Sequence, residues 1–320
     1  MKALMQSEAA TSQDVEVYFL DVGQGDSSLI VDRAEKAAML IDCPPGKEFV
    51  VEDLLESIGI VGLESAMLTH WDMDHYGGFL SVVQSVGCKT LYYNHDTLMA
   101  FDESMPMRKA ALLELLEPSL ERLAHLPANR GASGQLGRLN WQMLAPAQIH
   151  LTQAVAKGDR NLASGVMRLE YANASFIVGG DADGRVWKKI KDDGLPLRCD
   201  VLRWPHHGAL NSKGGLNEDD LISETSPHYV VISTGTGNRY KHPAKLAITS
   251  ARRTANVACT EVTSKCHSAV RGRGVACGGT LGFRVSSDGG IAPIEGWTLL
   301  DSRVASWDHP LCRVNNGAGM

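Results

Sequence analysis

Four side chains of the types that bind metal ions fall within six residues of this chain, in the segment His70-Trp71-Asp72-Met73-Asp74-His75. Imidazole and carboxylate groups crowded in this way repel, shift one another's pKa values or coordinate a cation. Histidine and aspartate suit zinc, manganese or iron, and a set without thiols leans toward the harder metals. The alternative is a polar loop in which Asp72 or Asp74 caps a helix. We favour a metal site.

Three further polar clusters come directly after stretches of strand-like sequence. They are Asp181, the pair His206-His207, and the run Asn238-Arg239-Tyr240-Lys241-His242. Loops at strand ends, held by a rigid scaffold, are a usual place for functional side chains. We therefore expect these clusters and the His70 segment to converge on one edge of the fold.

The elements that must position these clusters are short strands with interspersed helices. Strands are predicted at 15–20, 27–31, 37–41, 65–68, 136–144, 165–171, 175–178, 199–204 and 229–233, and helices at 48–57, 77–86 and 184–191. Two β-rich halves of this kind favour an α/β (α+β) fold built as a four-layer αββα sandwich. The leucine stripe over 105–126, broken at Pro118, predicts two helices that either pack as a hairpin, which we favour, or cover the site.

One domain is expected, because no linker separates the halves. The predicted division is a flexible N-terminus over 1–13, a hydrolase domain over 14–300 and a C-terminal tail over 301–320. The net charge of −6 gives no overall positive field, so any contact with nucleic acid would be local. No signal segment or membrane span is evident, which favours a cytoplasmic protein without a membrane partner.

Seven cysteines, an odd and widely spread number, are typical of reduced thiols. Cys259, Cys266, His267 and Cys277 could hold a structural zinc ion of the Cys₃His type, but they lack the closely spaced cysteine pairs of such sites. Free buried thiols are the simpler interpretation. A further cysteine, Cys312, lies outside this cluster and nearer to the C-terminus.

The His70 segment resembles the HxHxDH signature of the metallo-β-lactamase superfamily, with Asp72 in place of the middle histidine. Six motifs in order resemble the hydrolase domain of the DNA-uptake protein family ComEC over roughly residues 15 to 245. They are the segments 20–27, 70–78, 161–169, 180–183, 204–208 and 238–243. The resemblance implies the metallo-β-lactamase fold.

The resemblance also implies two divalent metal ions, zinc or manganese. His70 and Asp72 would bind the first ion and Asp74 and His75 the second, with Asp181 bridging both. One of His206 and His207 would complete the second site. The sequence leaves open which one, because neighbours at a strand end point to opposite sides. Many superfamily members carry a histidine where Asn161 lies, so the first site is short of one ligand.

Two metal ions about 3.5–4 Å apart can polarise a phosphoryl oxygen and hold a bridging hydroxide as the nucleophile. Asp74 and Asp181 are candidate proton acceptors. His242, together with Arg239, Tyr240 and Lys241, offers donors and positive charge for a phosphate. Asp26 and Asn161 are candidates for contacts with the substrate or the metal surroundings, and Asp26 is alternatively a turn residue.

These residues predict a phosphodiesterase or nuclease acting on DNA or RNA. One alternative is a hydrolase of a small ester, such as a phosphorylcholine ester, a cyclic nucleotide or a lactone. The other is a catalytically weak metal-binding subunit. The expected partner is nucleic acid or a small phosphodiester, and a protein encoded in the same operon is a further hypothesis.

Overall fold

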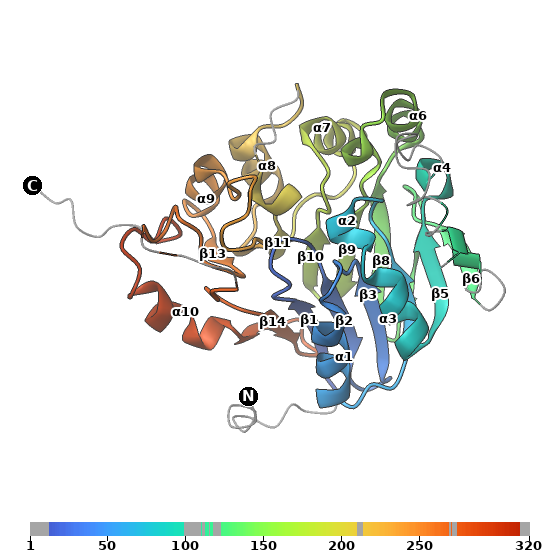
Figure 1. Cartoon of the computed structure of the whole chain (residues 1–320), viewed down its shortest axis with the longest axis horizontal. Coiled ribbons are helices and arrows are strands. Elements are labelled where there is room, and N and C mark those ends of the chain that lie inside the picture. The colour runs from blue at the N-terminus through green and yellow to red at the C-terminus, as the bar shows by residue number, and fades with distance from the viewer. Residues whose placement is uncertain are drawn as a thin grey trace, which may run out of the picture.

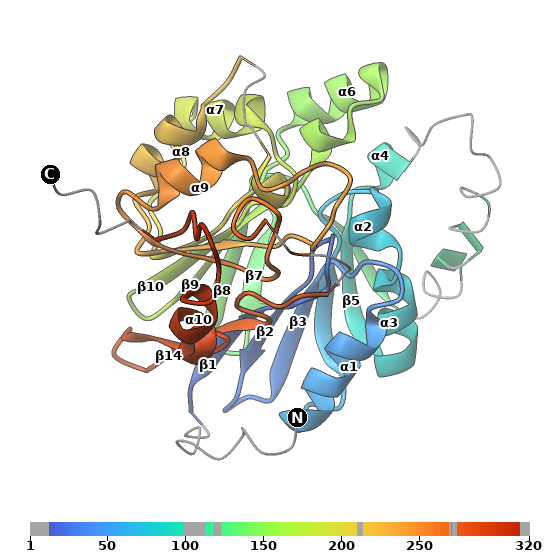
Figure 2. The same cartoon turned by 60° about the vertical axis from the view of Figure 1, so that its left-hand side comes forward.

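The computed structural model describes residues 13–98, 110, 113–114, 116–117, 123–209, 214–268, 270 and 274–313. Two β-sheets pack against each other, and helices cover the outer face of each (Figures 1 and 2). This arrangement confirms the predicted four-layer αββα sandwich.

The first sheet has eight strands in the order β15-β14-β1-β2-β3-β4-β5-β6. They are β1 (Val15–Phe19), β2 (Ser28–Asp32), β3 (Ala37–Ile41), β4 (Leu63–Met67), β5 (Cys88–Tyr93), β6 (Ala124–Pro127), β14 (Leu281–Val285) and β15 (Ile291–Glu295). The helices of this half are α1 (Glu48–Ser57), α2 (Met73–Tyr76), α3 (Phe79–Val86) and α4 (His95–Leu98).

The second sheet has seven strands in the order β13-β12-β11-β10-β9-β8-β7. They are β7 (Ser133–Leu136), β8 (Leu139–Ala145), β9 (Val166–Tyr171), β10 (Ala174–Val178), β11 (Val201–Arg203), β12 (Tyr229–Ile232) and β13 (Asn256–Cys259). Its helices are α6 (Gln148–Lys157), α7 (Gly184–Asp192), α8 (Glu218–Thr225) and α9 (Lys245–Ala251), with short 3₁₀ turns η1 (Arg160–Ala163) and η2 (His206–Gly208). Helix α10 (Trp297–Val304) follows β15.

Parallel pairing explains how distant loops reach one place. In the first sheet β3, β4 and β5 run parallel, and in the second β10, β11, β12 and β13 do so. Because parallel strands end at the same edge of a sheet, the loops after β3 and β4 emerge at one edge of the first sheet, and the loops after β10, β11 and β12 emerge at one edge of the second. Those loops carry the polar clusters found in the sequence.

Strand β1 and the residue after it show how both faces of the first sheet are covered. Val17 and Phe19 belong to the core between the sheets, whereas Tyr18 and Leu20 belong to a second core under α1 and α3. Successive side chains of a strand point to opposite faces, so both faces of this sheet are covered. Phe283 of β14 packs edge-on against the rings of Phe19, Phe176, Tyr229 and Trp297.

Most predicted elements lie within a few residues of their observed bounds, but the region 105–126 does not. Residues 110, 113, 114, 116 and 117 are helical, and the other residues of 105–122 lie outside the described part. Residues 124–126 belong to β6, so the prediction of helix there is wrong. Pairing with β5 places this segment at the sheet edge, a long-range effect that its leucines do not reveal.

The C-terminal residues that the structure describes pack onto the domain. Helix α10 crosses the predicted boundary at residue 300, and Arg313 donates to the Val257 carbonyl oxygen at 3.1 Å. Arg252 in turn donates to the Leu311 carbonyl oxygen at 2.7 Å. Residues 1–12 of the predicted N-terminal segment and residues 314–320 of the predicted tail lie outside the described part. No helix within the described ranges is long and apolar enough to cross a membrane.

Candidate metal centre

The segment after β4 presents its side chains toward the second sheet. His70 lies in the loop that follows β4, and Asp74 and His75 lie on the single-turn helix α2. Thr69 holds this loop, because its backbone N–H donates to Asp42 Oδ1 at 2.8 Å and its hydroxyl donates to Asp42 Oδ2 at 2.6 Å. The loop is therefore tied to the end of β3 as well as to β4.

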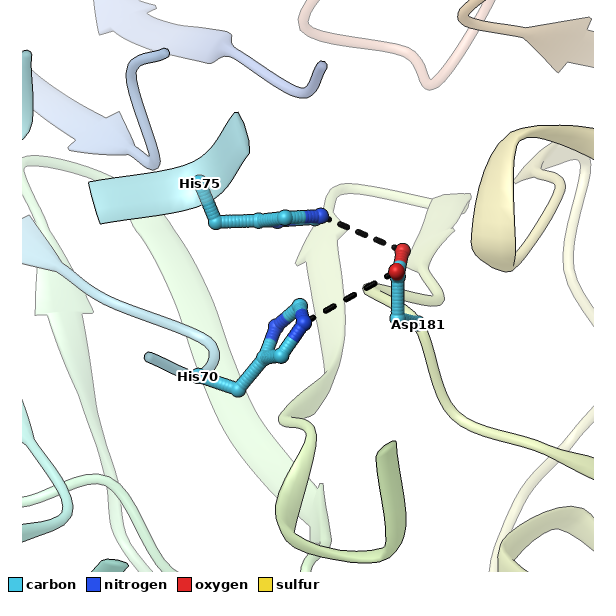
Figure 3. A group of neighbouring side chains, drawn as sticks. All are labelled: His70, His75 and Asp181. Atoms are coloured by element: carbon cyan, nitrogen blue, oxygen red, sulfur yellow. Dashed lines mark ion pairs between the residues drawn. The ribbon is translucent and has the colours of Figure 1, made fainter. Parts of the chain in front are cut away.

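Asp181, just past β10, is the buried carboxylate on which this segment converges. His75 Nε2 lies 3.2 Å from its Oδ1, and His70 Nε2 lies 3.7 Å from its Oδ2. Figure 3 shows both rings pointing at the carboxylate from one side. The Ser164 hydroxyl accepts the Asp181 backbone N–H at 2.8 Å, which fixes the position of the carboxylate.

His207 of η2 completes a compact group on the other side of Asp181. Its Nε2 lies 3.4 Å from Asp74 Oδ2 and 3.7 Å from Asp181 Oδ1. One ligand atom from each of Asp74, His75 and His207 lies within 4.8 Å of the others, and the same holds for His70, His75 and Asp181. The structure thus has candidate His/Asp metal sites where the sequence predicts them.

The donor atoms of these groups fit a metal ion. Nε2 of His70, His75 and His207 and Oδ1 of Asp181 are buried and have no hydrogen-bond partner. A buried polar atom without a partner costs about 1–3 kcal/mol, and four at one point are not explained by packing. Divalent cations bound among these atoms would satisfy them.

The predicted first site is more open. Asp72 Oδ2 lies 3.5 Å from His70 Nε2, but its Oδ1 pairs with Arg160 at 2.5 Å. Within the described ranges, neither Asp72 nor His206 belongs to a group of three ligand atoms as close as those above. A hollow of about 230 Å³, lined by Asp72 and by residues 158–161, opens beside this side of the centre.

Two buried carboxylates orient the histidines of the compact group. Asp42 Oδ2 lies 2.8 Å from His75 Nδ1, and Asp26 Oδ1 lies 3.2 Å from His207 Nδ1. Asp26 is 1% exposed and also pairs with the buried guanidinium of Arg203, whose pKa is lowered to about 9 by burial. This position suits an orienting residue, and one carboxylate oxygen of Asp26 also lies within 4.8 Å of ligand atoms of Asp181 and His207. The contact of Asp26 with substrate stays a prediction.

The electrostatics show how strongly the groups depend on one another. Burial on its own lowers the pKa of His75, but the carboxylates of Asp181 and Asp42 raise it well above its ordinary value. Burial raises the pKa of Asp181, and the imidazoles of His75 and His207 outweigh it and hold that pKa well below the ordinary value. Protons and metal ions compete for such groups, so the same arrangement suits a cation.

The loop after β12 forms the outer rim of the centre. The ring of His242 lies 5.6 Å from that of His206, and Tyr240 stacks on His242 with an angle of 13° between the rings. Burial and the nearby His206 and His207 lower the pKa of His242 to about 4. Arg239, Tyr240 and Lys241 are exposed, and the Arg239 guanidinium lies 4.7 Å above the Tyr240 ring.

Asn238 gives this loop its shape. Its carboxamide oxygen accepts from the His242 backbone N–H at 2.9 Å, and its amide nitrogen donates to the His242 carbonyl oxygen at 2.8 Å. The predicted site residues lie at the centre or at its rim, with Asp26 among the residues that surround the ligands.

The cysteines form no comparable centre. Cys259, Cys266, Cys277 and Cys312 are buried, but His267 Nδ1 pairs with Asp308 at 2.9 Å. Among the residues that the structure describes, no three of these sulfur and imidazole ligand atoms lie within 4.8 Å of one another. A preformed Cys₃His site is therefore absent there, in keeping with free buried thiols.

Sequence reasoning missed three residues of the centre, namely Asp42, Arg160 and Arg203. Asp42 follows β3 directly, so the rule that found Asp181 at the end of β10 would have found it too. Arg203 lies within an apolar strand, and nothing in the sequence separates it from an arginine whose side chain reaches solvent. Arg160 precedes Asn161, and only the folded loop brings it to Asp72.

Comparison with known proteins gives one family match and several relatives. Residues 20–194 match the metallo-beta-lactamase superfamily. The chain is 27% identical to ComE operon protein 3 of Bacillus subtilis over 72% of its own length and 30% of the relative's. It is 26% identical to the competence protein ComA of Neisseria gonorrhoeae over 74% of its length and 30% of the relative's.

The chain therefore spans about a third of the length of these curated relatives. Among solved structures, the Zn²⁺-bound PqqB from Methylobacterium extorquens is 10% identical, with a TM-score of 0.47 over 76% of this chain and 97% of that one.

Proposed function

Because the chain belongs to the metallo-β-lactamase superfamily, we propose that it is a two-metal phosphodiesterase or nuclease. The matches to the competence proteins confirm the resemblance drawn from the six motifs. The observation that best supports the proposal is the Asp181 carboxylate. Each of its oxygens faces a different set of imidazoles, as expected of a group shared by two cations.

We assign the second ion to Asp74, His75 and His207, and the first to His70 and Asp72, with Asp181 between them. Zinc and manganese both suit donors of these types. Two such ions, when bound, lower the pKa of a water molecule and polarise a phosphoryl oxygen. Asp42 and Asp26 keep the imidazoles of His75 and His207 in place.

The chain's own residues supply the other requirements of phosphodiester hydrolysis. Asp74 Oδ2 and Asp181 Oδ1 face the interior of the centre and are candidate proton acceptors. At the rim, the ring N–H of His242 can donate a hydrogen bond to a leaving oxygen. Arg239 and Lys241 place positive charge beside it for the phosphates of the substrate.

The rim favours a nucleic acid over a small ester. The chain as a whole is acidic, so the exposed cations Arg239 and Lys241, with the half-buried Lys265 beside them, form a local positive surface. Phosphate contacts of this kind dominate affinity for nucleic acids. The relative from Neisseria gonorrhoeae is named a competence protein and one from Haemophilus influenzae a recombination protein, which supports the same substrate class.

The test is a panel of substrates incubated with the metal-loaded protein. DNA, RNA, a chromogenic phosphodiester, a cyclic nucleotide and a lactone would each be assayed with Zn²⁺ and with Mn²⁺. We expect cleavage of nucleic acid by the wild type and loss of cleavage in Asp181→Asn. The surface control is Asp219→Asn, which should behave as the wild type. Asp219 is exposed, and its salt bridge is with Arg253, which is also exposed.

The outcomes separate the alternatives. Cleavage of the cyclic nucleotide or the lactone alone would replace the nuclease assignment with a small-ester hydrolase. Cleavage of no substrate by a folded, metal-loaded wild type would overturn the proposal.

A further inference from the structure

We infer that the adjacent histidines of η2 serve different metal ions: His207 binds the second ion, and His206 binds the first, where it replaces the histidine that position 161 lacks. The inference rests on the two-ion centre proposed above. It assigns His206 as a metal ligand. The spacing of the His206-His207 motif does not identify this ligand, and His206 is absent from the compact groups of donor atoms described above.

The geometry around Asp181 carries this assignment. Its Oδ1 is approached by His75 Nε2 at 3.2 Å and by His207 Nε2 at 3.7 Å. Its Oδ2 is approached by His70 Nε2 at 3.7 Å and by His206 Nε2 at 3.6 Å. The carboxylate thus has two imidazoles on each oxygen. If the carboxylate bridges two cations with one oxygen on each, the two pairs of imidazoles belong to different ions.

The backbone explains how two neighbours can point at one carboxylate. In an extended strand end, His206 and His207 would project to opposite sides. Both instead have left-handed backbone angles, with φ of 51° and 52°, and Gly208 continues at 81°. The two rings lie 6.3 Å apart with an angle of 69° between them. Left-handed conformations of residues other than glycine are uncommon and gather at functional sites.

Asn161 occupies the far side of the His206 ring. Its side-chain amide nitrogen lies 3.5 Å from His206 Nδ1, while His206 Nε2 faces Asp181. The oxygen and nitrogen of a carboxamide are interchangeable by a rotation of the group, so its oxygen can accept from an Nδ1–H. A ligating histidine commonly has such a partner on its other ring nitrogen. Asn161 is therefore a positioning residue for His206, and His206 is the imidazole of the first site.

The first site is looser than the second. His70, His206 and Asp181 do not form a group with all three ligand atoms within 4.8 Å among the described residues, so the His206 ring must turn inward when an ion binds. Its side chain is 34% exposed, against 2% for His207, which leaves it room to turn. Arg160 also holds one oxygen of Asp72. We expect the first ion to bind more weakly than the second.

The experiment measures metal binding and needs no substrate. Purified metal-free wild type, His206→Ala and His207→Ala would be titrated with Zn²⁺ against a competing chelator, with folding checked by circular dichroism. His228→Ala is the matched control, because His228 is an exposed histidine that pairs with Asp200. Co²⁺-loaded samples would be examined by proton NMR for the shifted ring N–H signals of ligating histidines.

We expect the wild type to bind about two ions with unequal affinity. His206→Ala should keep the tighter ion, and its affinity for the weaker ion should fall by more than about 100-fold. A loss of that size exceeds the usual effect of removing a residue that only orients a ligand. His207→Ala should lose the tighter ion. Adding Asn161→His to His206→Ala should restore the weaker ion, because an imidazole then returns to the first site.

Three results would overturn the inference while leaving the proposed function standing. The first is a folded His206→Ala variant with both affinities within about 100-fold of the wild type, which would make His206 at most an orienting residue. The second is an unchanged set of shifted N–H signals in that variant. The third is a folded double variant that does not recover the weaker ion. A wild type that binds no ion would instead overturn the proposed function itself.

Discussion

Replacing Asp42 with asparagine tests whether the metal centre depends on its buried supporting carboxylates. Asp42 Oδ2 lies 2.8 Å from His75 Nδ1, and the carboxylate also accepts the backbone N–H and the hydroxyl of Thr69. Asparagine has nearly the same shape but only one accepting oxygen. If that oxygen keeps the Thr69 N–H, the amide group faces His75 and cannot accept its Nδ1–H.

The expected cost follows from the role of such a partner. Loss of a group that orients a metal-binding histidine lowers metal affinity by about 10-fold to 100-fold. That range corresponds to about 1.4–2.8 kcal/mol of binding free energy. Titration of the metal-free Asp42→Asn protein with Zn²⁺ against a chelator would measure it, and the tighter ion should be the one affected, because His75 belongs to the compact group.

The matched control is Asp32→Asn. Asp32 is also fully buried, but its partner is Arg138, which donates to it from both Nε and Nη2. This control should leave metal affinity unchanged. A folded Asp42→Asn protein with wild-type affinity would refute the orienting role, and equal losses in both variants would show that the effect is only one of stability.

Three further predictions concern the fold. Burial on its own raises the pKa of Asp32, but hydrogen bonds from Arg138 outweigh it and hold that pKa below its ordinary value. Asp32→Asn should therefore lower the free energy of unfolding by about 2 kcal/mol at neutral pH. In urea titrations this difference should persist down to about pH 5 and shrink as the pH falls through the native-state pKa; a difference independent of pH would contradict this. Phe283→Ala, which removes a ring packed among four others, should cost about 3–5 kcal/mol in the same titrations, and a loss below about 1 kcal/mol would show that the core collapses around the gap. Gly208→Ala should lower both the melting temperature and metal affinity, because a Cβ there would lie 2.3 Å from Pro243 Cβ and the backbone is left-handed; wild-type behaviour in both would contradict this packing.

The sequence could predict the members of the site because they follow strands. Asp181, His207 and the run from Arg239 to His242 each come after an apolar stretch with strand character, and parallel pairing brings those ends together. The sandwich follows from the same pattern of apolar strands and interspersed helices. These patterns are local in the sequence, and the folded chain has the strands and helices that they predict.

The features that could not be predicted depend on the folded backbone. The left-handed angles at His206 and His207 decide where both rings point, and no residue type at those positions signals them. Burial of Arg203 depends on its pairing with Asp26, which lies far away in the sequence. Strand β6 forms by pairing with β5, whereas its own sequence ends a leucine-rich stretch with a helical pattern.

The position of bound metal tests the central claim most directly. Crystals of the protein grown with Mn²⁺ would be measured by anomalous diffraction at the manganese edge. We expect two peaks about 3.5–4 Å apart, one on each side of the Asp181 carboxylate, with His75 and His207 at one peak and His70 and His206 at the other. Peaks elsewhere, or none beside Asp181 in fully loaded crystals, would contradict it.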